Sequence, residues 1–187
     1  MRLRTSFFLG LGLLLLAVPA RAQERANEEA RPSPNAAVSQ TIGTTDVTVT
    51  YGRPSARDRV IFGDSLAAER PLVPYGDVWR TGANEATTIT FSDDVTVEGQ
   101  PLAAGTYALF TIPGEDEWTV IFNEEAAQWG AYEYDMSRDA LRVTVDADEG
   151  EYAEMMTFSF DEVSENMGEL VLRWADTAVS LTIGAGQ

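Results

Sequence analysis

The stretch TYALFTIPGEDEWTVIF, residues 106–122, decides the fold of this chain. Residues 106–112 are apolar on both faces, which is typical of a strand that is covered on both sides. Pro113, Gly114, Glu115 and Asp116 form a turn cluster, and a second short apolar run follows at Trp118–Phe122. The stretch therefore predicts a β-hairpin whose first strand is central in a sheet.

Apolar residues alternate with polar ones on both sides of this hairpin. Such alternation predicts half-buried antiparallel strands, because successive side chains of a strand point to opposite faces. A further short turn is expected at Gly99 and Gln100, between Val95–Glu98 and Pro101–Ala103. The alternating apolar positions are Val47, Val49 and Tyr51; Ile89 and Phe91; Leu141, Val143 and Val145; Met156, Phe158 and Phe160; Leu170, Leu172 and Trp174; and Val179, Leu181 and Ile183.

Many short strands with regular turns predict an all-β protein, an antiparallel β-sandwich that is jelly-roll-like or a partly open barrel. Trp118 and Trp174 are expected in its core. Helical pattern is scarce, and we expect only one or two short helical turns, at Asp64–Glu69 and Glu124–Gln128. The sandwich is expected to form a single domain over residues 38–187, preceded by a flexible acidic leader over residues 23–37.

The first 22 residues predict a secretory signal peptide. Arg2 and Arg4 precede the apolar run Phe7–Val18, and Ala20–Ala22 is an A-x-A cleavage site. The run is too short to span a membrane, which takes about 20 apolar residues. We therefore expect export to the periplasm or the cell exterior, with cleavage before Gln23 and no membrane span.

The composition excludes several kinds of chemistry. The chain has 187 residues with 30 acids and 13 bases, and all the bases are arginine, because Lys, His and Cys are absent. These absences exclude Ser-His-Asp and Cys-His catalysis, lysine Schiff bases, imidazole and thiolate metal sites, and disulfides. The net charge of −17 disfavours nucleic acid and anionic membranes as partners, since both need a basic face. Acid excess without lysine also predicts a halophilic protein, whose self-repulsion is screened by salt.

A series of ordered motifs carries a resemblance to a known family. The motifs are YGRPS at 51–55, IFG at 61–63, LVPYG at 72–76, WRTGANEAT at 79–87, AGTYALFTIP at 104–113, WTVIFN at 118–123 and QWG at 128–130. Over about residues 38–183 the chain resembles the secreted bacterial family called domain of unknown function 2911. The resemblance implies an exported all-β domain without an established activity, and it supplies no catalytic residues. Asp64–Pro71 departs from the family pattern as an insertion.

Candidate ligand-binding residues lie in the turn-rich motifs. Arg80, Asn84 and Glu85 are close together in one loop, and a guanidinium beside an amide suits sugar hydroxyls or a carboxylate. Arg53 is expected near the mouth of another loop. The alternative for both arginines is structural pairing, such as an ion pair between Arg80 and Glu85.

Two aromatic residues, Trp129 and Tyr132, lie outside any clear strand. Exposed rings of this kind stack on sugars in many binding proteins, and the alternative is that they fold onto the edge of the sandwich. The acidic run Asp146–Glu151 has D-x-D spacing but lacks the further ligands of a calcium loop. No metal, no cofactor and no catalytic residue is therefore expected.

Three classes of function remain open. The favoured one is a non-catalytic binding module for a small polar ligand or glycan. The second is an envelope protein-interaction or scaffold module that uses a sheet edge or the Asp64–Pro71 loop. The third is a carboxylate-based hydrolase with Glu85 as the candidate acid. A cleft containing Arg80, Glu85 and Trp129 would favour the first, and facing carboxylates in a cleft would favour the third.

Overall fold

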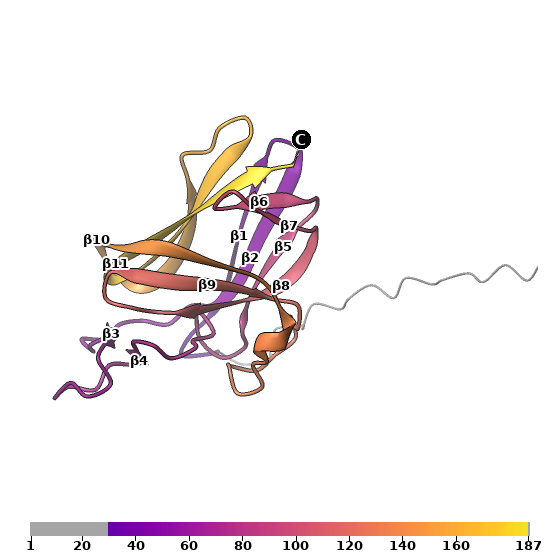
Figure 1. Ribbon diagram of the computed structural model, residues 1–187. Coiled ribbons are helices and arrows are strands. Elements are labelled where there is room, and N and C mark those ends of the chain that lie inside the picture. Colours follow the sequence, from indigo (N-terminus) through magenta and orange to yellow (C-terminus); the bar gives the residue numbers. More distant parts are fainter. Residues whose placement is uncertain (1–29, 187) are drawn as a thin grey trace, which may run out of the picture.

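Figure 1 shows the computed structural model of the protein, which describes residues 30–186. The predicted signal peptide and the first part of the expected leader, up to residue 29, lie outside the described residues. Nine strands form one continuous sheet in the order β1-β2-β5-β8-β9-β10-β11-β6-β7. The sheet folds over into two layers, which confirms the predicted all-β, sandwich-like class.

The strands are distributed over the two layers as follows. One layer holds β1 (Asn35–Ile42), β2 (Thr45–Gly52), β5 (Thr87–Phe91), β8 (Gly105–Ile112) and β9 (Glu117–Asn123). The other holds β6 (Val95–Val97) and β7 (Gln100–Leu102). Two long strands, β10 (Asp139–Asp161) and β11 (Met167–Ala185), connect them. A separate parallel pair is formed by β3 (Phe62–Gly63) and β4 (Val73–Pro74).

The strands β10 and β11 are longer than the alternation pattern predicts. β10 contains both the alternating positions 141–145 and 156–160, and β11 contains both 170–174 and 179–183. β10 pairs with β9 through residues 139–146 and with β11 through residues 147–161. Register shifts between Glu149 and Thr157 interrupt the second ladder, and irregularities of this kind bend a strand. The acidic run Asp146–Glu151 therefore lies within a strand.

The hairpin that decides the fold is confirmed. β8 and β9 pair antiparallel, and β8 stands between β5 and β9 with residues 107–111 buried. The short β6–β7 hairpin is also present, but its turn lies one residue earlier than expected, at Glu98 and Gly99. Both residues have positive φ, 48° and 73°, as tight two-residue hairpin turns require.

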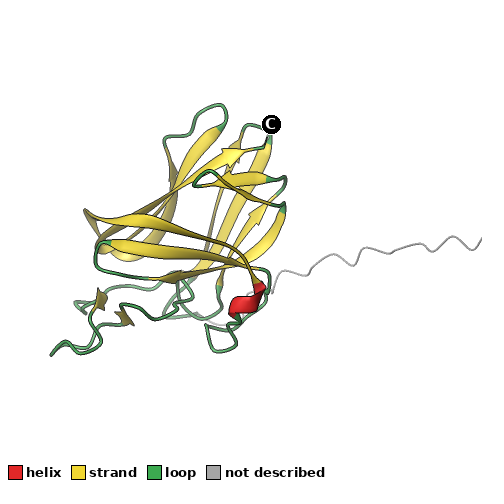
Figure 2. Cartoon of the chain, in the orientation of Figure 1, coloured by secondary structure: helices red, strands yellow, loops and turns green. Residues whose placement is uncertain are grey.

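The expected helical turns at Asp64–Glu69 and Glu124–Gln128 are wrong. The Asp64 carboxylate accepts a hydrogen bond from the backbone N–H of Leu66 at 2.7 Å, and such a local turn competes with a helix. Within residues 30–186 the one helical element is a 3₁₀ turn at Met136–Arg138 (Figure 2). It is capped by Asp135, whose side chain accepts a hydrogen bond from the backbone N–H of Ser137.

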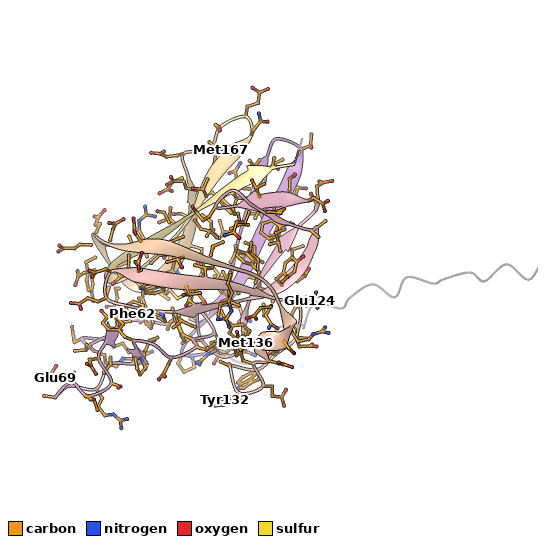
Figure 3. The ribbon with its side chains drawn as sticks, viewed as in Figure 1. Phe62, Glu69, Glu124, Tyr132, Met136 and Met167 are labelled. Atoms are coloured by element: carbon orange, nitrogen blue, oxygen red, sulfur yellow. The ribbon has the colours of Figure 1, made fainter. Side chains whose placement is uncertain are left out.

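An aromatic cluster fixes one end of the core. Trp118 and Trp174 are 1% exposed, as expected, and their rings pack with those of Phe62 and Trp79. The Trp79 and Trp174 rings are stacked, with centroids 5.8 Å apart. Aromatic pairs contribute about 0.5–1.5 kcal/mol beyond simple burial. The long loops gather at the same end of the sandwich as Phe62, opposite the turn that joins β10 to β11 (Figures 1 and 3).

Candidate functional site

The Trp79–Glu85 loop is fixed by its own hydrogen bonds. The backbone of Trp79 exchanges two hydrogen bonds with Thr111, of 2.7 and 2.9 Å, and its indole Nε1 donates to the carbonyl of Gly82 at 3.2 Å. The Thr87 hydroxyl donates to the carbonyl of Thr81 at 2.7 Å. Thr81 is buried and has a φ of 51°, in the left-handed region. The loop is therefore a rigid structure that presents selected side chains.

A close backbone approach holds this loop against β2. The N–H of Ala83 donates to the carbonyl of Gly52 at 3.2 Å. A Cβ atom at Gly52 would stand 2.0 Å from the carbonyl oxygen of Ala83, so only glycine fits there. The glycine of the YGRPS motif is thereby explained by packing.

The chain just before β1 crosses the Trp79–Glu85 loop, and we call residues 31–34 the strap. The carbonyl of Ser33 accepts a hydrogen bond from Asn84 Nδ2 at 3.2 Å, and the carbonyl of Pro34 accepts one from the N–H of Arg53 at 2.8 Å. The strap and the start of β1 at Asn35 both fall within the range expected for a flexible leader. This part of the chain is thus attached to the domain.

Glu85 pairs with the strap instead of with Arg80. Arg31 Nη1 lies 3.0 Å from Glu85 Oε1 and 2.8 Å from Oε2. The Glu85 side chain is 5% exposed, so the ion pair is largely removed from water on the carboxylate side. The alternative of an Arg80–Glu85 pair is wrong. Glu85 therefore holds the strap in place, which offers no support for the role of a hydrolytic acid.

Arg80 is a partly buried guanidinium without an acidic partner among residues 30–186. Its Nε is buried and forms no hydrogen bond there. Burial lowers the pKa of Arg80, because desolvation disfavours the charged form, while the nearby Tyr132 acts in the opposite direction. In a chain with 30 acids, this cation is placed where no described carboxylate reaches it.

A cavity of about 370 Å³ lies beside the loop and includes Arg80, Asn84 and Ser33 in its lining. Arg59 and Trp174 also line it. The indole Nε1 of Trp174 is buried and, like Arg80 Nε, has no hydrogen-bond partner among the described residues. Arg59 is oriented by hydrogen bonds to two backbone carbonyl oxygens. Among residues 30–186 the lining contains no Asp or Glu, so this part of the lining is rich in donors and carries positive charge.

Arg53 follows the last residue of β2 and contacts β10. Its Nε donates to the carbonyl of Met156 at 2.8 Å, and its Nη2 donates to the hydroxyl of Thr157 at 2.6 Å. The side chain thus connects the end of β2 to β10, and it is not part of the cavity lining. This is a structural position of the kind that the alternative for Arg53 describes.

Trp129 and Tyr132 lie outside the cavity lining. Trp129 forms an isolated backbone bridge with Glu85, and its side chain is 55% exposed. Tyr132 is 86% exposed and lies near Met136 at the loop end of the sandwich (Figure 3). The structure therefore brings Arg80 and Asn84 together at the cavity, while the two aromatic rings and Glu85 are not part of it.

A second cavity, of about 460 Å³, is lined by acids that lie far apart in the sequence. Glu115, Asp148, Glu149 and Asp176 line it, and all four are exposed. Exposed carboxylates at turns and strand edges form an ordinary solvated face. Within residues 30–186 no group of three Asp or Glu side chains is arranged to hold a metal ion.

Sequence reasoning missed Arg59, Trp174 and the strap as parts of the candidate site. Arg59 has no periodic or motif signal. Trp174 is correctly predicted as a core residue, and a core prediction gives no indication that its indole N–H has no partner among residues 30–186. The strap has the polar, proline-containing composition of a linker. Only its contacts with residues 53 and 84 show that it belongs to the site.

The fold and the cavity define a β-sandwich protein with a donor-lined site beside one end of its core. The chain belongs to the family described as "Protein of unknown function (DUF2911)", whose model matches residues 33–183. No curated protein and no solved structure matches the chain. In the described part of the chain, no helix has the length and apolar character needed to cross a membrane.

Proposed function

We propose that this protein is a non-catalytic binding module that holds a small polar ligand in the cavity beside the Trp79–Glu85 loop. The observation that carries the proposal is Arg80, which lines that cavity and whose buried Nε has no hydrogen-bond partner among residues 30–186. A buried donor without an acceptor is costly, by about 1–3 kcal/mol, and a bound ligand that accepts the hydrogen bond removes the cost. Ligand sites are commonly concave and mainly apolar, with a few well-placed polar groups.

The surroundings of Arg80 favour binding over catalysis. In the described part of the chain neither Asp nor Glu lines the cavity, and the chain has no His, Cys or Lys that could serve as a base or nucleophile there. The signal-peptide pattern of residues 1–22 supports binding in the periplasm or outside the cell as part of this proposal.

Thermal-shift measurements on the purified protein in molar salt test the proposal. The panel consists of sugars, cell-wall fragments, amino acids and Ca²⁺. A ligand at 100 times its dissociation constant adds about 2.7 kcal/mol to the stability of the folded state, which raises the melting temperature measurably.

Two variants locate the binding step. Arg80→Ala should abolish the shift without loss of the fold, whereas Arg70→Ala, an arginine on the exposed Asp64–Pro71 loop, should leave it unchanged. A shift that survives Arg80→Ala would refute this site.

A second candidate function is protein–protein contact through the Asp64–Pro71 loop. Leu66 is 90% exposed, and the loop projects away from the sandwich, with Glu69 at its outer end (Figure 3). A photo-crosslinker at position 66 should capture an envelope protein in cells, and one at Val163, at the opposite end of the sandwich, should not. Equal labelling from both positions would contradict this function.

A further inference from the structure

We infer that the ligand of the donor-lined cavity is a monoanion that carries a carboxylate group on an apolar body. This inference rests on the proposed function, because it names the chemical class of ligand for the same cavity. It follows from three features of the cavity: its local charge, its unsatisfied donors and its apolar walls.

The local charge of the cavity is opposite to that of the protein. The chain as a whole carries a net charge of −17, yet the described lining of the cavity contains two arginines and no acid. Neither Arg59 nor Arg80 forms an ion pair with a described carboxylate. Two cations at one cavity that form no ion pair with a described acid favour an anionic ligand.

The unsatisfied donors indicate what the ligand must offer. Arg80 Nε and Trp174 Nε1 are both buried N–H donors without acceptors among residues 30–186, and both residues line the cavity. Trp174 is 1% exposed, so its side chain is almost completely buried. An indole N–H can only donate, and a guanidinium presents a planar fork that matches a carboxylate. The ligand must therefore bring acceptor oxygens.

The apolar lining of the cavity and the donors available in it narrow the class of anion that can bind. Pro54, Leu72 and Val73 contribute apolar surface to the cavity, together with Trp79. These walls fit the carbon body of an aliphatic or aromatic acid. Arg59 and Asn84 already donate to backbone carbonyl oxygens, which leaves few donors for the several oxygens of a phosphate, so a carboxylate is preferred over a phosphate.

Nuclear magnetic resonance of the tryptophan indole N–H groups tests this inference. The chain has four tryptophans, so the indole region of an ¹⁵N-correlation spectrum is simple, and the Trp174 signal is assigned from triple-resonance spectra. The probes are benzoate and butyrate, their neutral counterparts benzamide and butyramide, and inorganic phosphate, all at one fixed ionic strength. We expect the carboxylates to move the Trp174 signal and to bind at least about tenfold more tightly than the amides, as loss of a charge-assisted hydrogen bond predicts.

Variants separate the charge of Arg80 from its hydrogen bonds. Arg80→Gln keeps amide donors and removes the cation, so carboxylate affinity should fall to the level of the neutral amides. Arg70→Gln removes the same charge from the exposed loop and should leave carboxylate affinity unchanged.

The failures of the two proposals are distinguishable. If the neutral amides bind as tightly as the carboxylates and move the Trp174 signal equally, the cavity is a binding site but the anion inference is wrong. Phosphate binding that is tighter than carboxylate binding also overturns the inference. If none of the probes moves the Trp174 signal and the thermal-shift panel is negative, both the inference and the proposed function fail.

Discussion

Arg31 and Glu85, 54 positions apart in the sequence, form an ion pair in which one guanidinium nitrogen lies within 3.0 Å of both carboxylate oxygens. The pair joins the strap to the Trp79–Glu85 loop. Because Ser33 of the strap lines the cavity, this contact also holds part of the cavity wall in place.

Removal of Arg31 should therefore destabilise the protein. Arg31→Ala leaves the buried Glu85 carboxylate without this partner, and we expect a loss of about 1.5–3 kcal/mol, the range for hydrogen bonds to charged groups. Chemical denaturation at constant salt measures it. Glu85→Gln in the Arg31→Ala background should restore part of the loss, because it removes the buried charge. A double-mutant cycle with no coupling between the two positions would contradict the ion pair.

The close approach of Gly52 to Ala83 predicts a strict requirement for glycine. Gly52→Ala places a Cβ 2.0 Å from the Ala83 carbonyl oxygen and forces the loop away from β2. We expect a loss of about 1–3 kcal/mol, as for other overpacked sites, together with weaker ligand binding. Gly63→Ala is the matched control, since its Cβ would meet its nearest atom at 3.6 Å, an ordinary contact. Equal stability of the two variants, measured by thermal unfolding, would contradict this role of Gly52.

A tyrosine network beside the 3₁₀ turn predicts a pH dependence. The Tyr134 hydroxyl donates to Asp139 Oδ2 at 2.6 Å and accepts a hydrogen bond from Arg142. Burial and, next, the hydrogen bond to Asp139 raise the pKa of Tyr134 to about 12. The fold thus favours the neutral phenol, so the unfolded chain loses this proton first. The stabilisation is complete below the ordinary tyrosine pKa of about 10 and is lost as the pH rises toward 12.

Tyrosinate absorbance measures this titration. Tyr134→Phe should remove a late titration step, and Tyr132→Phe, which removes the hydroxyl of an exposed tyrosine, should leave that step in place. A late step that persists in Tyr134→Phe would assign the raised pKa to another tyrosine.

The acid excess predicts stabilisation by salt. Self-repulsion in a chain with a net charge of −17 is screened when the Debye length falls from about 10 Å at 0.1 M salt to about 3 Å at 1 M. The melting temperature should therefore rise over that range. A variant with Asp148→Asn, Glu149→Gln and Glu151→Gln, all exposed positions, should show a smaller rise. Equal melting temperatures of the natural protein in low and high salt would refute halophilic adaptation.

The sequence predicts the local parts of the fold well. The β8–β9 hairpin is found because its apolar strands and its Pro-Gly turn are adjacent in the chain. The continuity of β10 is missed for a physical reason. Where this strand passes from one layer to the other, Asp148, Glu149, Glu151 and Tyr152 are all exposed, so both faces meet water and the alternation disappears.

The candidate site is predicted only in part. Arg80 and Asn84 are found because they lie in one unusual motif, and both line the cavity. The partner of Glu85 and the unsatisfied N–H of Trp174 depend on which distant segments meet in space. Spacing along the chain contains no information about such contacts.

The position of β11 has a consequence for dividing the chain into fragments. Its first part pairs with β10 and its last residues pair with β6, so it is the strand that joins the β6–β7 hairpin to the rest of the sheet. A cut in the Glu162–Asn166 turn would therefore yield two fragments. The larger fragment would lack the strand between β10 and β6, and the smaller fragment would consist mainly of that strand, β11. Such a pair has the arrangement needed for fragment complementation, in which addition of the strand peptide restores the fold.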